Sequence, residues 1–152
     1  MRTRREWLKL CAQGFMVAAP VAALGAAAGG DNDVEVWKSA TCGCCRLWVD
    51  HMRGHGFRPK TQDVEDMNFY KRKYGVPARL VSCHTALVGG YVLEGHVPAD
   101  VVRQMLKERP KIVGLAVPGM PMGSPGMEGS RKDPYDVVAF DKAGQTRVYA
   151  KR

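Results

Sequence analysis

The residues with the clearest chemical potential are cysteines that begin at position 42. Cys42, Cys44 and Cys45 lie in the segment TCGCC, after a polar turn and at the start of a segment with helical spacing. A helix N-terminus carries partial positive charge and so favours thiolates. Because thiolates act both as nucleophiles and as metal ligands, the segment predicts thiol redox chemistry or a metal site.

Three interpretations of this segment compete. Cys42 and Cys45 could form a structural disulfide in an oxidising compartment, or a dithiol that exchanges disulfides. The third interpretation is a metal site, which Cys44 favours. An extra thiol between an attacking and a resolving thiol invites mispairing, whereas thiolates can bridge neighbouring metal ions. Cys83 lies about 40 residues later in the chain, and we expect it to join Cys42, Cys44 and Cys45 in a patch of four thiols.

The methionines indicate which metal such a patch would take. Soft sulfur ligands select Cu(I), zinc or iron–sulfur clusters. Met120, Met122 and Met127 follow one another in a segment rich in glycine and proline. Zinc seldom uses a thioether, whereas Cu(I) accepts one readily. We therefore expect Cu(I), with Met120 and Met122 as candidate ligands, unless these methionines only fill gaps beneath a long loop.

Histidines could add nitrogen ligands to the sulfur atoms. His51 lies along the same helical edge as Cys44 and is the histidine that helix geometry places nearest the cysteines. His55 is farther along the helix and is expected at the surface. His84 adjoins Cys83, and although neighbouring residues of a strand point to opposite faces, this rule is soft at the first residue of a strand, so His84 stays a candidate. His96 precedes a helix, where a side chain can satisfy backbone groups.

The order of the expected elements indicates the fold. The expected elements are a strand at 34–37, a helix at 42–55, an edge strand at 57–64, a helix at 66–74, a hairpin around Gly89 and Gly90, a helix at 97–106 and a second hairpin at 135–150. This order resembles the thioredoxin fold, in which the first helix begins with a C-x-x-C motif. We predict an α/β, thioredoxin-like fold (β-α-β-α-β-β-α) with a C-terminal Gly/Pro/Met-rich loop and β-hairpin. In that fold Cys83 faces the first cysteines.

The chain begins with a segment typical of export signals. Arg4 and Arg5 precede an apolar stretch that ends in an A-x-A cleavage pattern at 26–28. The paired arginines resemble the twin-arginine signal, which exports folded proteins. We expect residues 1–28 to be a cleaved signal and 29–152 to be one copper-binding domain. No apolar run reaches the ~18–20 residues of a membrane span.

The net charge of +8 does not by itself indicate a nucleic-acid partner. The basic residues are scattered and do not form a stripe with stacking aromatic side chains, so we expect no nucleic-acid binding.

Four motifs resemble the CopG-type copper-resistance proteins. They are CGCC at 42–45, SCHTA at 82–86, EGHVP at 94–98 and GLAVPGMP at 114–121, and they occur in this order. The resemblance covers about residues 34–150. It implies a thioredoxin-like fold, a periplasmic location, copper binding by the C-x-C-C motif, a part in copper tolerance, and redox cycling of the bound copper.

The leading hypothesis is a periplasmic copper-binding protein. It would hold several Cu(I) ions on Cys42, Cys44, Cys45 and Cys83, with His51 and a methionine at 120–127 completing the site. Its partners would be copper ions and a periplasmic copper-handling or electron-transfer protein. The sequence leaves open whether it is a copper-dependent oxidoreductase, a store or a carrier. A thiol–disulfide oxidoreductase that uses Cys42 and Cys45, and a zinc-stabilised structural domain, are the alternatives.

Overall fold

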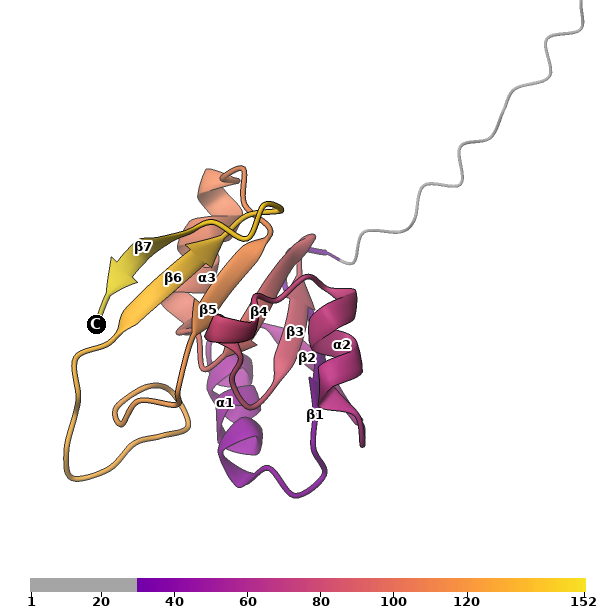
Figure 1. The fold of residues 1–152 in the computed structure, drawn as a ribbon. Helices are drawn as coiled ribbons and strands as arrows, with labels where there is room; N and C mark the ends of the chain where they lie inside the picture. Colours follow the sequence, from indigo (N-terminus) through magenta and orange to yellow (C-terminus); the bar gives the residue numbers. More distant parts are fainter. Residues whose placement is uncertain (1–29) are drawn as a thin grey trace, which may run out of the picture.

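The computed structural model describes residues 30–152, so the predicted signal at 1–28 lies outside the described residues. The elements are β1 (Asp33–Lys38), α1 (Gly43–Gly54), β2 (Arg58–Asp63), α2 (Met67–Lys73), the short 3-10 helix η1 (Ala78–Leu80), β3 (Thr85–Val88), β4 (Tyr91–Gly95), α3 (Ala99–Glu108), β5 (Gly114–Val117), β6 (Asp136–Phe140) and β7 (Thr146–Lys151) (Figure 1). The fold is therefore mixed α/β, as expected.

One mixed sheet of seven strands organises the chain, in the order β2-β1-β3-β4-β5-β6-β7. The pairs β1–β2 and β4–β5 are parallel, and the other neighbours are antiparallel. The strand that contains Pro59 lies at the edge of the sheet, as its proline predicts. The expected succession of strand, helix, strand, helix, hairpin and helix is also observed.

The core has two parts, one on each face of the sheet. Helices α1 and α3 share the larger part, which includes Trp48, Met52 and Met105. The smaller part contains Val76 and Leu80, which follow α2 in the chain. In α1 the buried residues are Cys45, Trp48, Val49 and Met52, a spacing that puts them on one helical face. The second cysteine of the C-x-x-C is thus also a core residue.

The hairpin of β3 and β4 turns at Gly89 and Gly90. Their φ angles are +53° and +87°, a region that glycine enters without a steric penalty. A two-residue turn with positive φ at both positions matches the twist of the flanking strands. This turn sets the register in which Thr85 pairs with Glu94 and Val88 with Tyr91.

Strand β5 is a feature that the sequence did not predict. Its four residues GLAV are all buried and show no alternation of polar and apolar side chains. A short apolar run of this kind is typical of a strand covered on both faces, and periodicity alone does not detect it. Strand β5 pairs with β4 and with β6, so it joins the C-terminal hairpin to the rest of the sheet.

Within residues 30–152, none of the helices has the length and hydrophobicity that a membrane span requires.

Because β5 joins the two parts of the sheet, its core side chain is important for stability. Leu115 is 0% exposed, and we expect Leu115→Ala to lower the free energy of unfolding by about 2–5 kcal/mol through the cavity it leaves. Denaturant unfolding measures this change. Val148→Ala on β7 is the control: Val148 is 49% exposed, and its loss should cost less than about 1 kcal/mol. Equal effects of the two variants would contradict this description of the core.

Candidate metal centre

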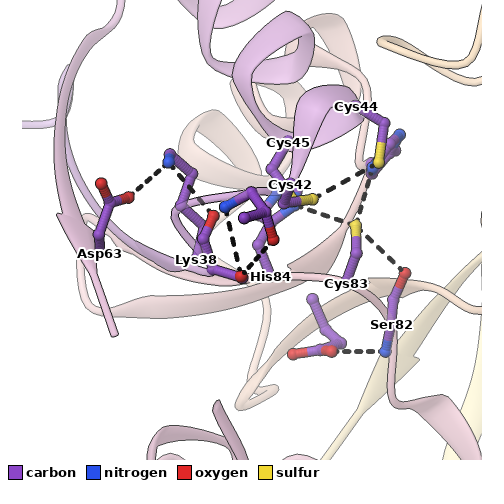
Figure 2. Close-up of a disulfide and its surroundings, with 12 residues drawn as sticks. Lys38, Cys42, Cys44, Cys45, Asp63, Ser82, Cys83 and His84 are labelled. Carbon is purple, nitrogen blue, oxygen red and sulfur yellow. Dashed lines mark hydrogen bonds and ion pairs between the residues drawn. A yellow bond between two sulfur atoms is a disulfide. The ribbon is translucent and has the colours of Figure 1, made fainter. Parts of the chain in front are cut away.

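The four cysteines predicted to act together meet at one end of the sheet. Cys42 is the N-cap residue of α1, and Cys44 and Cys45 lie in its first turn. Cys83 lies just before β3. Because β1 and β3 are neighbours, with Trp37 opposite Thr85, the chain leaving β1 and the chain entering β3 are side by side. The four sulfur atoms lie within 4.8 Å of one another (Figure 2).

Two of these cysteines are oxidised in the structure. Cys42 and Cys45 form a disulfide, with their Cα atoms 5.4 Å apart. Cys44 and Cys83 are free thiols, and Cys44 Sγ lies 3.6 Å from Cys42 Sγ. The same small patch can therefore hold a disulfide with two thiols or, once reduced, four thiols.

Two histidines join Cys83 in a second group of potential ligands. Cys83 Sγ lies 2.9 Å from His96 Nε2 and 3.3 Å from His84 Nδ1. Ligand atoms of all three residues lie within 4.8 Å of one another, and both imidazole rings are fully buried. Cys83 thus belongs to both groups and connects the sulfur cluster to two nitrogen donors.

From the sequence, His51 was favoured over both of these histidines, with His84 kept as a candidate, although the register of the hairpin indicates His96. Counting outward from the Gly89–Gly90 turn along the observed register places Cys83 opposite His96. The rule that neighbours in a strand point to opposite faces does not exclude His84, because residues 83 and 84 precede the strand.

Burial sets the protonation states of these three side chains. Burial lowers the pKa of His96 to about 4 and that of His84 well below its usual value, so both rings are neutral at pH 7. Neutral imidazole is the form that binds metals. His84 Nε2 and His96 Nδ1 have no hydrogen-bond partner among residues 30–152. Burial also raises the pKa of Cys83 to about 12, so a metal must displace its proton to bind.

This donor set fits a soft metal ion. Thiolate and neutral imidazole suit copper and zinc, and no carboxylate belongs to either group of ligand atoms in the described chain.

His51 makes a different contact from the one expected. Its Nε2 accepts a hydrogen bond from the backbone N–H of Ala99 at 3.1 Å, at the start of α3. Its ring also packs against the ring of His55, with centroids 4.2 Å apart. His51 belongs to neither group of potential ligands among residues 30–152, and its observed contact connects α1 to α3.

The methionine-rich loop lies against the first turns of α1. Gly126 is buried with φ +86°, and a Cβ added there would lie 2.6 Å from Cys44 O and 2.9 Å from Trp48 N. Only a glycine fits this approach. Met120 is 40% exposed and Met122 is half-buried, so both lie on a loop that adjoins the cysteines. Figure 1 shows this loop, between β5 and β6, beside α1.

Comparisons with known proteins identify similar chains. Residues 80–127 match a protein-family model described as "Protein of unknown function, DUF411". The structure described as "Copper resistance protein copG- Form 1" is 44% identical with a TM-score of 0.75, and the alignment covers 79% of this chain and 96% of that chain. Its "Form 2" is 46% identical with a TM-score of 0.73, with 79% and 97% covered. No curated protein matches.

The contact of Gly126 with α1 can be tested with a matched pair of variants. Gly126→Ala and Gly119→Ala both place alanine at positive φ, which costs about 1–2 kcal/mol. Only position 126 also has backbone atoms in the way, so we expect Gly126→Ala to cost about 1–3 kcal/mol more in unfolding free energy. Amide hydrogen exchange at 119–127 should accelerate in Gly126→Ala beyond its rate in Gly119→Ala. Identical exchange in the two variants would show that the loop does not depend on this contact.

Proposed function

This chain belongs to the family of the CopG copper resistance proteins, and we propose that it is itself a copper-binding protein that acts in copper tolerance. The observation that carries the proposal is the meeting of Cys42, Cys44, Cys45 and Cys83 within 4.8 Å. A patch of soft sulfur donors is a site for Cu(I). The name of the two similar structures supports copper over zinc as the metal.

We propose that the reduced site holds more than one Cu(I) ion. The four sulfur atoms lie within 4.8 Å of one another, and each thiolate can bridge two ions. Several Cu(I) ions could therefore bind with sulfur ligands on every ion. His84 and His96 would supply nitrogen on the Cys83 side. Met120 and Met122 remain candidates for a thioether ligand because their loop adjoins Cys44.

Loading of this site would depend on the disulfide. Reduction of Cys42–Cys45 takes two electrons and two protons from a dithiol, which becomes a disulfide in turn, and yields two thiols. Cu(I) then displaces the thiol protons into solvent. In the oxidised state Cys44 and Cys83 are the free thiols among residues 30–152. Copper capacity should therefore follow the redox state of Cys42 and Cys45.

The mixture of sulfur and nitrogen donors supports redox cycling of bound copper. Thiolates favour Cu(I), whereas imidazole also suits Cu(II), so a site with both can tolerate either state. We propose that one electron passes between the bound copper and an electron-transfer protein in each cycle. The neutral state of His84 and His96 means that this change needs no prior loss of a proton from the rings.

The arrangement of the first four strands supports a thioredoxin-like fold. Their order is β2-β1-β3-β4, with β1 parallel to β2 and antiparallel to β3. The C-x-x-C of Cys42 and Cys45 lies at the start of α1, as in that fold. We infer that β5, β6 and β7 extend a thioredoxin-like unit at its β4 edge.

We propose a periplasmic location for this protein. The signal expected at 1–28 and its paired arginines support export of the folded chain by the twin-arginine route. An oxidising compartment is also consistent with the disulfide in the structure. The partner there would be a protein that handles copper or transfers electrons.

Disulfide exchange is the second candidate function, and the Cys42–Cys45 disulfide at a helix N-terminus favours it. In the reduced protein Cys42 would attack a substrate disulfide and release one substrate thiol, and Cys45 would then attack the mixed disulfide and release the second. The substrate disulfide is thereby reduced by two electrons, and the Cys42–Cys45 disulfide forms. Cys44 argues against this function, because its sulfur lies 3.6 Å from Cys42 Sγ and can compete as the resolving thiol.

Anaerobic Cu(I) titration against a competing chelator tests the copper proposal. We expect the reduced domain at 29–152 to take up several Cu(I) ions per chain, and the disulfide form to take up fewer. Cys44→Ser and Cys83→Ser should each lower the capacity, and His96→Gln should weaken binding about tenfold or more. His51→Gln is the matched histidine control, because its Nε2 contacts Ala99 N.

Two results would contradict this proposal. Weak uptake of a single ion by the reduced wild-type chain would exclude a multi-copper site. If His51→Gln weakens Cu(I) binding more than His96→Gln does, the nitrogen ligand is His51 on α1 and not His96.

Reduction of a small disulfide substrate separates the two candidate functions. If exchange is the function, Cys42→Ser abolishes the reaction while Cys83→Ser leaves it intact, since Cys83 takes no part in the exchange. If copper binding is the function, we expect exchange in the metal-free wild-type chain to be slow and to be suppressed by one equivalent of Cu(I). Rapid exchange that copper does not affect would favour the oxidoreductase.

A further inference from the structure

Helix α2 buries a lysine and no other residue. Lys71 is 4% exposed, whereas every other residue between Met67 and Lys73 is at least partly exposed. A helix that covers a sheet normally buries apolar side chains, and lysine is almost never buried without a partner. The burial of Lys71 therefore needs a specific explanation in the interior of the protein.

The partner of Lys71 is Glu94, the residue of β4 that lies two positions before His96. Lys71 Nζ donates to Glu94 Oε1 at 2.5 Å, and the two side chains are 6% and 0% exposed. Lys71 Nζ also donates to Thr85 Oγ1 at 3.2 Å. Because both side chains are buried, this is not a surface ion pair.

The Glu94 carboxylate holds the chain segment that carries Cys83 and His84. Its Oε1 atom accepts a hydrogen bond from Ser82 N at 2.6 Å, directly before Cys83. Its Oε2 atom accepts one from Thr85 Oγ1 at 2.7 Å, directly after His84. One carboxylate thus binds both ends of the segment 82–85 that contains two of the potential ligands.

Gly95, the residue before His96, lets the segment 82–85 pack closely against the end of β4. Gly95 N donates to His84 O at 2.9 Å. The φ of Gly95 is +71°, and a Cβ there would lie 2.6 Å from Ser82 Cβ and 2.7 Å from Val117 O. Glycine at this position permits the close approach, and the hydrogen bonds to Glu94 set where the segment lies.

We infer that the buried Lys71–Glu94 pair is a positioning device for the metal centre, which acts through Ser82 N and Thr85 Oγ1 to hold Cys83 against His96 and the cysteines of α1. Lys71 keeps Glu94 compensated in the interior, and Glu94 positions the ligand segment. Neither residue is a ligand. This inference rests on the proposed copper site, but it also predicts a property of the metal-free protein.

The need for a positioning device follows from where Cys83 lies. It is in the connection between η1 and β3, outside any helix or strand. A ligand on a connection loses binding energy when the connection is free to move, because metal binding must then order it. A carboxylate with hydrogen bonds to both ends of the segment removes that freedom before the metal arrives.

Two double variants separate positioning from stability. In Lys71→Met/Glu94→Leu no oxygen remains for Ser82 N, whereas in Lys71→Met/Glu94→Gln the amide oxygen remains. Both remove the two buried charges together, which avoids leaving one uncompensated and is often neutral for folding. Glu108→Gln, an exposed glutamate on α3, is the matched surface control.

We expect the leucine variant to bind Cu(I) about tenfold or more weakly than the wild type, which corresponds to about 1.4 kcal/mol. The glutamine variant and the Glu108→Gln control should stay within about threefold of the wild type. Thermal unfolding and circular dichroism on the same samples show whether each variant is folded. A purely structural role predicts that affinity follows thermal stability in both double variants, whereas positioning predicts that it follows the oxygen at position 94.

Alkylation of Cys83 in the metal-free protein provides a readout that needs no copper. In a Cys44→Ser background with the Cys42–Cys45 disulfide intact, Cys83 is the free thiol of the described domain. We expect its alkylation rate to rise about fivefold or more in the leucine variant and to return toward the wild-type rate in the glutamine variant. If the leucine variant does not fold, Thr85→Val takes its place, because it removes the hydroxyl that joins Glu94 to the far end of the segment.

The outcomes distinguish this inference from the proposed function. If the wild-type chain takes up several Cu(I) ions but the folded leucine variant binds them as tightly and its Cys83 reacts as slowly, the positioning role is overturned and the copper site stands. If the wild-type chain binds no Cu(I), the copper proposal fails. The alkylation rates then still decide whether Glu94 orders the segment.

Discussion

The placement of β3 between β1 and β4 is the constraint on which the candidate site depends. Strand β1 leads into the helix that carries Cys42, Cys44 and Cys45. The chain entering β3 carries Cys83 and His84, and the chain leaving β4 carries His96. All three connections emerge at the same end of the sheet, since β3 is antiparallel to both of its neighbours. Backbone hydrogen bonding therefore brings together potential ligands that are far apart in the sequence.

Burial of polar groups gives this end of the sheet its chemical character. Desolvation keeps His84 and His96 neutral and Cys83 protonated, and two imidazole nitrogens lack partners in the described chain. A protein tolerates such groups when a ligand or a network compensates for them. In the Lys71–Glu94 pair the two buried charges compensate each other, and Glu94 is hydrogen-bonded to both ends of the segment that carries Cys83 and His84. Buried polar side chains are thus concentrated around Cys83.

Local pattern predicted most of the framework and part of the site. Helical spacing from Cys45 to Met52 located α1, and the Gly89–Gly90 turn located the hairpin. Strand β5 escaped detection because four apolar residues buried on both faces carry no period. His51 was favoured because helix geometry is easy to extend along a sequence. Its observed partner, Ala99 N, lies on α3, and the geometry of α1 alone cannot predict a contact with another helix.

The sequence by itself determined which atoms are available: soft sulfur in a C-x-C-C motif, a distant cysteine, and methionines in a glycine-rich loop. These are properties of composition and short spacing, and they are sufficient to indicate the class of metal. Only the tertiary structure decided which nitrogens lie beside Cys83 and which side chains form hydrogen bonds to its segment. His96 and Glu94 reach the site through the register of a hairpin, and Lys71 reaches it through the packing of α2 on the sheet. The physical reason is that ligand identity is local, whereas ligand proximity results from strand pairing and burial across the whole fold.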